Sequence, residues 1–366
     1  MSPEKGRSNG SLKVKLLVGI IIVLLVFLAL WFGMHLIENH LKGEESQYGD
    51  TGDWGKDKSE GEDLEDGDEQ VLIFGDNDLV YTDDIRTYLL IGTDDTGHDN
   101  VTANRGEMAD FVMLMIINRT KDSYGFIQLN RDTMMDVPIL DENGEFIGTY
   151  NEQLCIAHWY GRTPEERNEN TVYAVSQLLG GLEINGYYSI NMDDIGALND
   201  AIGGVVVTID GDLTGVDPEF EDGKDVLLKG DQAEKYLRAR MGVGEGTNEE
   251  RMDRQLTYMQ AAYGRLINQI RENPDYINDV YSEVEDKVLT DRPIKEFSEF
   301  AAYIGKVENL GFLRFDGEVK TGDTLDDGIE HAEFYPDQDS MIRTIGKLIT
   351  LKQAAPDTED EEPEEG

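Results

Sequence analysis

Residues 108–133, MADFVMLMIINRTKDSYGFIQLNRDT, decide the fold. Two apolar runs in this stretch, DFVMLMIIN and GFIQLN, are rich in the β-branched and aromatic residues that favour strands. The polar segment between them, NRTKDSYG, predicts a hairpin turn, so the second strand returns alongside the first. The end of the second strand then lies beside the beginning of the first. This places Arg131 and Asp132 next to Asp110.

A third apolar run, TYLLIG at residues 87–92, ends shortly before Asp94. If this strand is antiparallel to DFVMLMIIN, Asp94 and Asp110 lie at the same end of the sheet. Carboxylates are the oxygen ligands that Mg²⁺ prefers, and the cation would join them to phosphate oxygens. Two alternatives remain open at this point. Aspartates are common at turns for local reasons, and Arg131 could form a structural ion pair with an aspartate.

A cluster of arginines lies in LKGDQAEKYLRARMGVGEGTNEERMDRQL, residues 228–256. Arg238 and Arg240 end one predicted helix, and Arg251, Arg254 and Gln255 begin the next. Spacings of three and four residues put the last three on one helical face, and a helix amino terminus favours anions. The cluster predicts phosphate binding. The alternative is that these arginines are solvated or paired with neighbouring acidic side chains.

The rest of the chain alternates between strand and helix patterns. Further short apolar runs predict strands at YYSIN, VVVTI and FLRFDG. Helical spacing of apolar residues occurs before Gly180, before Gly203 and over residues 252–270. Residues 275–306 also have a helical pattern, and QDSMIRTIGKLITL predicts a closing helix. The fold class is therefore α/β, with helices covering a mixed central sheet.

Composition restricts the classes of function. The 366 residues suffice for one sizeable core with an anchor and tails, and 76 acidic against 32 basic residues give a formal charge of −44. Such a charge argues against a nucleic-acid partner, because phosphate chains are repelled at long range. Cys155 is the only cysteine, which excludes an intrachain disulfide and a site of several thiolates. We expect Cys155 to be a small buried apolar residue.

A candidate membrane span lies near the amino terminus. Residues 16–34, LLVGIIIVLLVFLALWFGM, contain no charge and at about 1.5 Å per residue nearly match the roughly 30 Å hydrocarbon core of a bilayer. A cleaved signal peptide usually has a shorter apolar region, so we expect a retained helix. Basic residues precede the run and acidic residues follow it, which places the amino terminus in the cytoplasm.

The expected organisation has five segments. They are a cytoplasmic N-terminus (1–15), a transmembrane helix (16–37), an acidic stalk (38–82), an extracellular folded domain (83–351) and a disordered acidic tail (352–366). The protein is accordingly expected in the cell membrane as a single-pass protein, with its C-terminal domain outside the cell.

The order of the motifs IGTDD, ADFVMLMIIN, QLNRDTMMDVP, LRAR and EERMDRQL resembles the LytR-CpsA-Psr family over about residues 83–270. The resemblance implies an α-β-α layered domain with a mixed central sheet and a hydrophobic tunnel for a polyprenyl chain. It also implies a membrane-anchored phosphotransferase that moves an anionic glycopolymer, such as teichoic acid or capsule, from a polyprenyl-(pyro)phosphate lipid carrier to the peptidoglycan of a Gram-positive cell.

The resemblance also implies roles for individual residues. Asp94 and Asp110 would hold Mg²⁺ (or Mn²⁺), and these two with Arg131 and Asp132 would be catalytic, Asp132 or another carboxylate accepting the proton. The residues implied to bind substrate phosphates are Arg131, Arg238, Arg240, Arg251, Arg254 and Gln255.

The sequence departs from the family pattern at three places. Met108-Ala109-Asp110 stands where many members have Gly-Arg-Ser-Asp, so Arg105 is farther from Asp110 than the arginine of that common motif. Asn248 stands three residues before Arg251, where family members commonly have an acidic residue. Cys155 stands where many members have asparagine. We regard these as marks of a divergent branch.

Two other functions fit the same residues. One is a pyrophosphatase that acts on polyprenyl pyrophosphates with water as the nucleophile. The other is a non-catalytic envelope regulator or glycan receptor, in which the arginines bind but Asp94 and Asp110 are dispensable. Substitution of both aspartates separates the catalytic from the non-catalytic reading.

Overall fold

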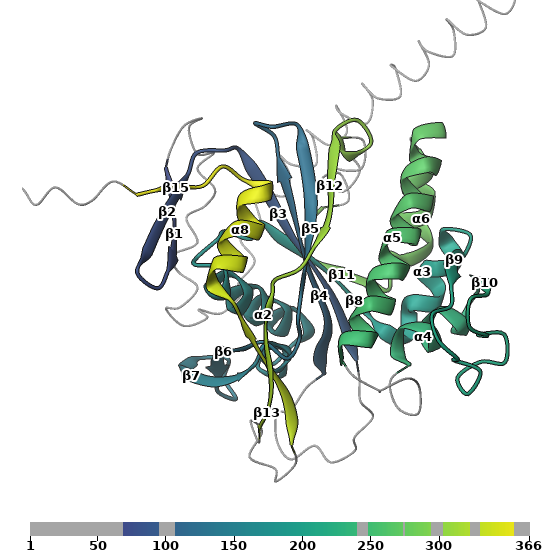
Figure 1. Ribbon diagram of the computed structural model, residues 1–366, viewed down its shortest axis with the longest axis horizontal. Coiled ribbons are helices and arrows are strands. Elements are labelled where there is room, and N and C mark those ends of the chain that lie inside the picture. The colour runs from purple at the N-terminus through teal and green to yellow at the C-terminus, as the bar shows by residue number, and fades with distance from the viewer. Residues whose placement is uncertain are drawn as a thin grey trace, which may run out of the picture. The chain divides into compact units, whose positions relative to one another are not determined.

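A mixed sheet of six strands lies at the centre of the part of the chain that the structure describes (Figure 1). Its order is β11-β8-β3-β4-β5-β12. β3, β4 and β5 are antiparallel neighbours, while β8 runs parallel to β3 and β12 runs parallel to β5. The predicted hairpin is therefore confirmed, and the condition that its first strand is antiparallel to the preceding one is met. The strands span β3 Ile85–Asp94, β4 Met108–Asn118, β5 Ser123–Leu129, β8 Gly186–Asn191, β11 Val288–Thr290 and β12 Glu308–Leu313.

This computed structural model describes residues 69–94, 107–239, 248–273, 275–293, 303–322 and 330–354. Among these residues, no helix is long and apolar enough to cross a membrane. The expected N-terminus (1–15) and transmembrane helix (16–37) lie outside the described residues.

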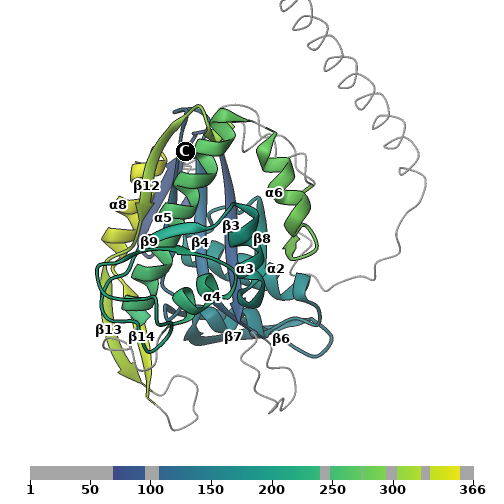
Figure 2. The ribbon, with the colours of Figure 1, turned by 90° about the vertical axis from the view of Figure 1, so that its right-hand side faces the viewer.

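Helices cover both faces of the sheet, which confirms the predicted α-β-α layers with a mixed central sheet (Figure 1, Figure 2). One face packs against α2 and α8, and the other faces α5 with the shorter helices α3, α4 and α6. The helices span α2 Pro164–Leu178, α3 Ile195–Ala201, α4 Asp231–Arg238, α5 Asn248–Glu272, α6 Tyr276–Val284 and α8 Gln338–Leu348.

Strand β4 is apolar without interruption from Phe111 to Ile117 because both of its faces are buried there. Val112, Leu114 and Ile116 pack into the core under α2 and α8, whereas Met113 and Met115 belong to the cluster that includes residues of α5. Successive side chains of a strand point to opposite faces, so a strand buried on both faces needs apolar residues at every position.

The domain begins earlier than residue 83. Strands β1 (Gln70–Phe74) and β2 (Asn77–Tyr81) form a hairpin, and β15 (Lys352–Gln353) pairs with β2. Leu72 and Leu79 belong to the main core. The expected stalk (38–82) is therefore wrong for residues 70–82, and the expected tail (352–366) is wrong at its first residues. The acidic composition upstream concealed the short alternation of apolar residues that places one face of the hairpin in the core.

Three further hairpins surround the sheet: β6 (Met134–Leu140) with β7 (Phe146–Gln153), β9 (Val205–Thr208) with β10 (Asp225–Leu228), and β13 (Gly317–Gly322) with β14 (His331–Pro336). Short 3-10 turns precede α2 and α3, η2 at Leu154–Trp159 and η3 at Met192–Asp194. Among the described residues of the range 275–306, the expected helical pattern holds in α6 and at residues 303–304, while residues 294–302 lie outside the described part of the chain. Residues 288–290 instead extend along β8 as an edge strand, because backbone pairing there outweighs local spacing.

Candidate active site

The charged residues of the site gather where β3 ends and β4 begins. Asp94 pairs in register with Met108, while Gly92 pairs with Phe111 and Thr93 with Ala109. Asp110 is therefore the extra residue of a β-bulge. A bulge bends the strand and redirects a side chain, and bulges are frequent beside active sites. Without the bulge, regular alternation would place Asp110 on the same core-facing side as Val112, so the bulge explains how Asp110 faces the charged cluster instead.

Asp110 joins two arginines that are far apart in the sequence. Its carboxylate forms an ion pair with Arg131, and its second oxygen lies 2.9 Å from Nη1 of Arg251. The three side chains are only 7–11% exposed. A buried charge is stable only when it is paired and hydrogen-bonded, so these groups depend on one another. The predicted convergence of Arg131, Asp132 and Asp110 is thus observed, with Arg131 Nε lying 3.2 Å from Asp132 Oδ1.

Asn248 belongs to the same network. Its amide donates to Asn130 Oδ1 at 2.9 Å and accepts from Arg251 Nη2 at 2.8 Å. Asn130 also accepts from the backbone amide of Asp132. An asparagine side chain both donates and accepts, whereas an ionised acid only accepts. The replacement of an acid by Asn248 therefore keeps the hold on Arg251 and adds a link to the end of β5.

A second group of charges surrounds Arg238, the last residue of α4. Its Nη2 atom lies 3.0 Å from Asp94 Oδ1 and 2.5 Å from Asp193 Oδ1, and its Nε atom lies 3.4 Å from Glu234 Oε1. Burial raises the pKa of Glu234 despite the adjacent Arg238.

Sequence reasoning missed Asp193 and Glu234. The i,i+4 spacing of Glu234 and Arg238 was a usable signal. Asp193 follows β8, whose parallel pairing with β3 brings it to the same edge as Asp94. Arg240 and Arg105 lie outside the described residues.

Arg254 and Gln255 occupy the same face of α5 as Arg251, as their spacing predicted. Arg254 is 7% exposed and donates to the carbonyl of Ala239. Its Nε atom is buried and, within the described residues, has no hydrogen-bond partner. Burial lowers the pKa of Arg254, but a guanidinium remains charged at neutral pH. An unused buried donor on a cation suits a bound anion.

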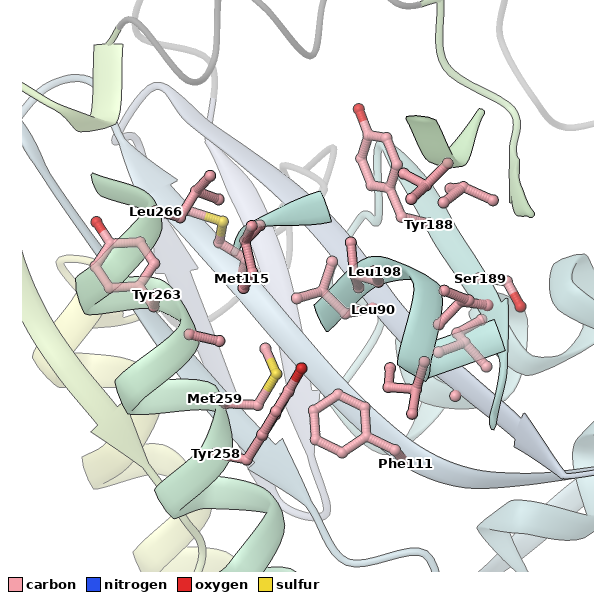
Figure 3. A pocket seen from close by; sticks show the side chains of 18 of the residues that line it. Leu90, Phe111, Met115, Tyr188, Ser189, Leu198, Tyr258, Met259, Tyr263 and Leu266 are labelled. Atoms are coloured by element: carbon pink, nitrogen blue, oxygen red, sulfur yellow. The ribbon is translucent and has the colours of Figure 1, made fainter. Parts of the chain in front are cut away.

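An apolar cavity begins beside these charges. It has a volume of about 310 Å³ and lies between the sheet and helices α3, α5 and α6. Gly92, Phe111 and Gln255 line it near the charged cluster, and Ile270 lines it farther along α5. Gln255 and Ile270 are fifteen positions apart, which corresponds to about 22 Å of helix. Figure 3 shows Tyr258, Met259, Tyr263 and Leu266 of α5 across from Phe111 and Met115 of the sheet.

The arrangement combines a cluster of arginines and aspartates with a long apolar cavity that starts next to it. A family model, described as the LytR_cpsA_psr family, matches residues 53–345. The chain belongs to the LytR-CpsA-Psr family. The resemblance seen in the motifs is confirmed, and the match extends upstream of β1 and through most of α8.

Several solved structures share the LytR-CpsA-Psr fold of this chain. TagV of B. subtilis is 18% identical with a TM-score of 0.53, and the match covers 72% of this chain and 95% of that one. TagT bound to LI-WTA is 16% identical with a TM-score of 0.52, covering 72% and 89%. Protein gbs0355 of Streptococcus agalactiae is 19% identical with a TM-score of 0.55, covering 74% and 89%. Comparison with curated proteins gives no match.

The two aspartates of this LytR-CpsA-Psr chain suit a hard cation. Oδ1 of Asp94 and Oδ1 of Asp110 are buried and near arginines, yet among the described residues neither accepts a well-aligned hydrogen bond. The described ranges contain no group of three or more His, Cys, Asp and Glu side chains placed to hold a metal. A cation would thus take two carboxylates and complete its shell with phosphate oxygens and water, as Mg²⁺ commonly does.

Cys155 and His158 have structural roles in η2. Cys155 is fully buried in a cluster with Ile156 and Trp159, and burial raises the pKa of its thiol. The expectation of a small buried residue is confirmed, and the thiol is protonated at neutral pH. His158 is 2% exposed and lies 3.2 Å from the hydroxyl of Thr171.

Acid is expected to destabilise the fold through His158. Burial, and to a lesser extent Arg167, lowers the pKa of His158 to about 3. The unfolded state therefore binds more protons than the native state below about pH 6.5, and stability falls as the pH falls through that value. Between pH 7.5 and 5.0 the free energy of unfolding should fall by about 2 kcal/mol through His158. Urea unfolding at both pH values should show a smaller acid loss for His158→Gln than for wild type. The control is His331→Gln, a substitution of a half-buried histidine, which should lose as much stability in acid as wild type. If His158→Gln also loses as much as wild type, His158 is not the source of the acid sensitivity.

Proposed function

We propose that this protein is a membrane-anchored phosphotransferase that moves an anionic glycopolymer from a polyprenyl-(pyro)phosphate carrier to peptidoglycan. The main support is that the arginine and aspartate cluster lies at the start of the apolar cavity. A polyprenyl phosphate has the same two parts, a charged head and a long apolar tail. One ligand of this kind would occupy both the charged cluster and the cavity, whereas a soluble sugar phosphate would leave the cavity empty.

The cavity supports the lipid part of the proposal. Its lining is almost wholly apolar, and it follows α5 from Gln255 to Ile270. Burial of apolar surface is favourable by roughly 25 cal/mol per Å². A tail in the cavity would therefore provide much of the binding energy, and the head would be held beside Arg251 and Arg254.

The charged cluster supports phosphoryl transfer. In this reaction the oxygen of an acceptor hydroxyl attacks the glycopolymer-linked phosphorus. The bond from that phosphorus to the oxygen of the polyprenyl phosphate breaks, and polyprenyl phosphate leaves. Arg131, Arg238 and Arg251 would bind the phosphate oxygens on which negative charge increases. Mg²⁺ (or Mn²⁺) held by Asp94 and Asp110 would neutralise part of the same charge.

The proton of the acceptor hydroxyl needs a base, and we expected Asp132 or another carboxylate. Asp132 is 6% exposed, and its Oδ1 atom lies 3.2 Å from Arg131 Nε and 3.3 Å from Gln153 Nε2. These contacts favour a role in holding Arg131. Asp193, whose side chain is 68% exposed beside Arg238, is better placed to meet an acceptor.

Family membership and the solved relatives agree with this proposal. One relative of the same fold is recorded as TagT bound to LI-WTA. The expected transmembrane helix (16–37) would keep the domain on the outer face of the cell membrane, where lipid carriers and peptidoglycan meet.

The test uses purified full-length protein and a polyprenyl-pyrophosphate-linked glycan in Mg²⁺, with and without peptidoglycan fragments. Release of the glycan that requires the acceptor is the expected result. Release without an acceptor would indicate hydrolysis by water. Tight binding without turnover would indicate a receptor. The double variant Asp94→Ala, Asp110→Ala should lose release in either catalytic case, and retained release would refute a role of these aspartates in catalysis.

A further inference from the structure

One arginine that lies outside the charged cluster holds the beginning of α5. Arg314 follows β12, and its guanidinium makes three contacts. Nε donates to Gln128 Oε1 at 2.8 Å, Nη1 lies 2.5 Å from Asp253 Oδ1, and Nη2 donates to the carbonyl of Met252 at 2.7 Å. Gln128, 2% exposed, also donates to the Met252 carbonyl at 3.3 Å. Arg314, Gln128, Met252 and Asp253 form what we call the β12 clamp.

The β12 clamp contacts the side of α5 that faces away from Arg251. At about 100° per residue, Asp253 lies about 200° around α5 from Arg251. Arg314 therefore contacts the side of α5 opposite to the phosphate-binding face. Strand β12, which ends at the residue before Arg314, is an edge strand of the sheet, and β12 and α5 are labelled in both views (Figure 1, Figure 2). Arg314 is thus not placed to touch a substrate at Arg251.

The β12 clamp also connects the two segments that carry arginines of the site, the end of β5 and the beginning of α5. Gln128 belongs to β5, the strand that leads into Arg131, and Met252 directly follows Arg251 in α5. On the substrate side, an amide hydrogen bond of 2.9 Å from Asn248 to Asn130 links the same two segments. A planar guanidinium with donors in fixed directions can join three acceptors rigidly, which an ammonium group cannot do.

We propose that Arg314 is a positioning residue that sets the distance between Arg131 and the arginines of α5 by holding α5 against β5. The inference rests on the proposed function in so far as these arginines bind the phosphates of the carrier. Catalysis by oriented charges is sensitive to displacement, and a shift of about 1 Å can cost about 100-fold in rate. Removal of Arg314 should therefore act mainly on phosphate binding and turnover.

The test measures binding of inorganic pyrophosphate in Mg²⁺ to the full-length protein by calorimetry. Arg314→Ala should weaken binding about tenfold, because charge-assisted contacts at the site depend on its geometry. Arg314→Lys should recover only part of the affinity. In an Arg251→Ala background the effect of Arg314→Ala should shrink to about threefold or less, because residues that act through one another are not additive. Full additivity would overturn the proposal.

Two further measurements separate positioning from general destabilisation. Arg343 on α8 is 62% exposed and lies 3.8 Å from Asp337, so Arg343→Ala is a matched control that should leave pyrophosphate affinity unchanged. Hydrogen exchange of residues 248–256 should accelerate in Arg314→Ala and not in Arg343→Ala. Unchanged exchange together with unchanged affinity would refute the clamp. If wild type does not bind pyrophosphate, the proposed function fails and exchange alone decides the role of Arg314.

Discussion

Asp110→Asn is expected to lower the rate of glycopolymer transfer by about 100- to 1000-fold, the range seen when one preorganised electrostatic contact is removed from a transition state. Asp110 pairs with both Arg131 and Arg251, so the substitution removes their shared counter-charge. In the absence of a divalent cation, inorganic pyrophosphate should then bind more tightly, because two arginines face the site without a carboxylate between them. Transfer and anion binding are thus expected to change in opposite directions.

The same variant should be less stable. Breaking a buried pair by removing one partner costs about 3–5 kcal/mol, and all three side chains here are nearly buried. Transfer should therefore be measured at a temperature where unfolding curves show the variant still folded. Asp136→Asn on β6, an exposed position, is the matched control. If Asp110→Asn transfers glycopolymer at a rate within a few-fold of wild type, Asp110 has no role in the proposed reaction.

Ala262→Trp is expected to raise the KM for a long polyprenyl carrier by about 100-fold. Ala262 of α5 lines the cavity, and an indole at this position would occupy space that a lipid tail needs. Each methylene group that loses its burial costs about 0.8 kcal/mol, so displacing three or four of them costs about 3 kcal/mol. Affinity for inorganic pyrophosphate should stay the same, because the charged cluster is not altered.

The control for this variant is Gln260→Trp, which places the same side chain at an exposed position of the same helix. Steady-state kinetics with carriers of long and short tails would distinguish the two variants. If Ala262→Trp affects long and short carriers equally, the cavity does not hold the tail. Stability should change little, since the new ring enters existing space and does not overpack a filled core.

Part of the site was predictable because it depends on contacts that are close in the sequence. The hairpin of β4 and β5 has a short turn, so Arg131 must return beside Asp110. The face shared by Arg251, Arg254 and Gln255 follows from 3.6 residues per turn. Neither inference needs to know how the rest of the chain packs.

Other features could not be predicted because their partners are far apart in the sequence. Asp110 and Arg251 are separated by 141 residues, and Arg314 and Gln128 by 186. The bulge that redirects Asp110 is one extra residue in a ladder, and no composition signal marks it. The β1–β2 hairpin was missed because its burial depends on β15 and the core beneath it.

The sequence by itself determined the α/β class, the hairpin of β4 and β5 and the face on which the arginines of α5 lie. It did so because the periods of strands and helices, and the length of a turn, are local properties of the chain. Only the tertiary structure decided which face of α5 meets which strand, that a cavity lies between them, and that Arg314 holds the helix from behind. These depend on how side chains from distant segments fill the same space, which local periodicity does not specify.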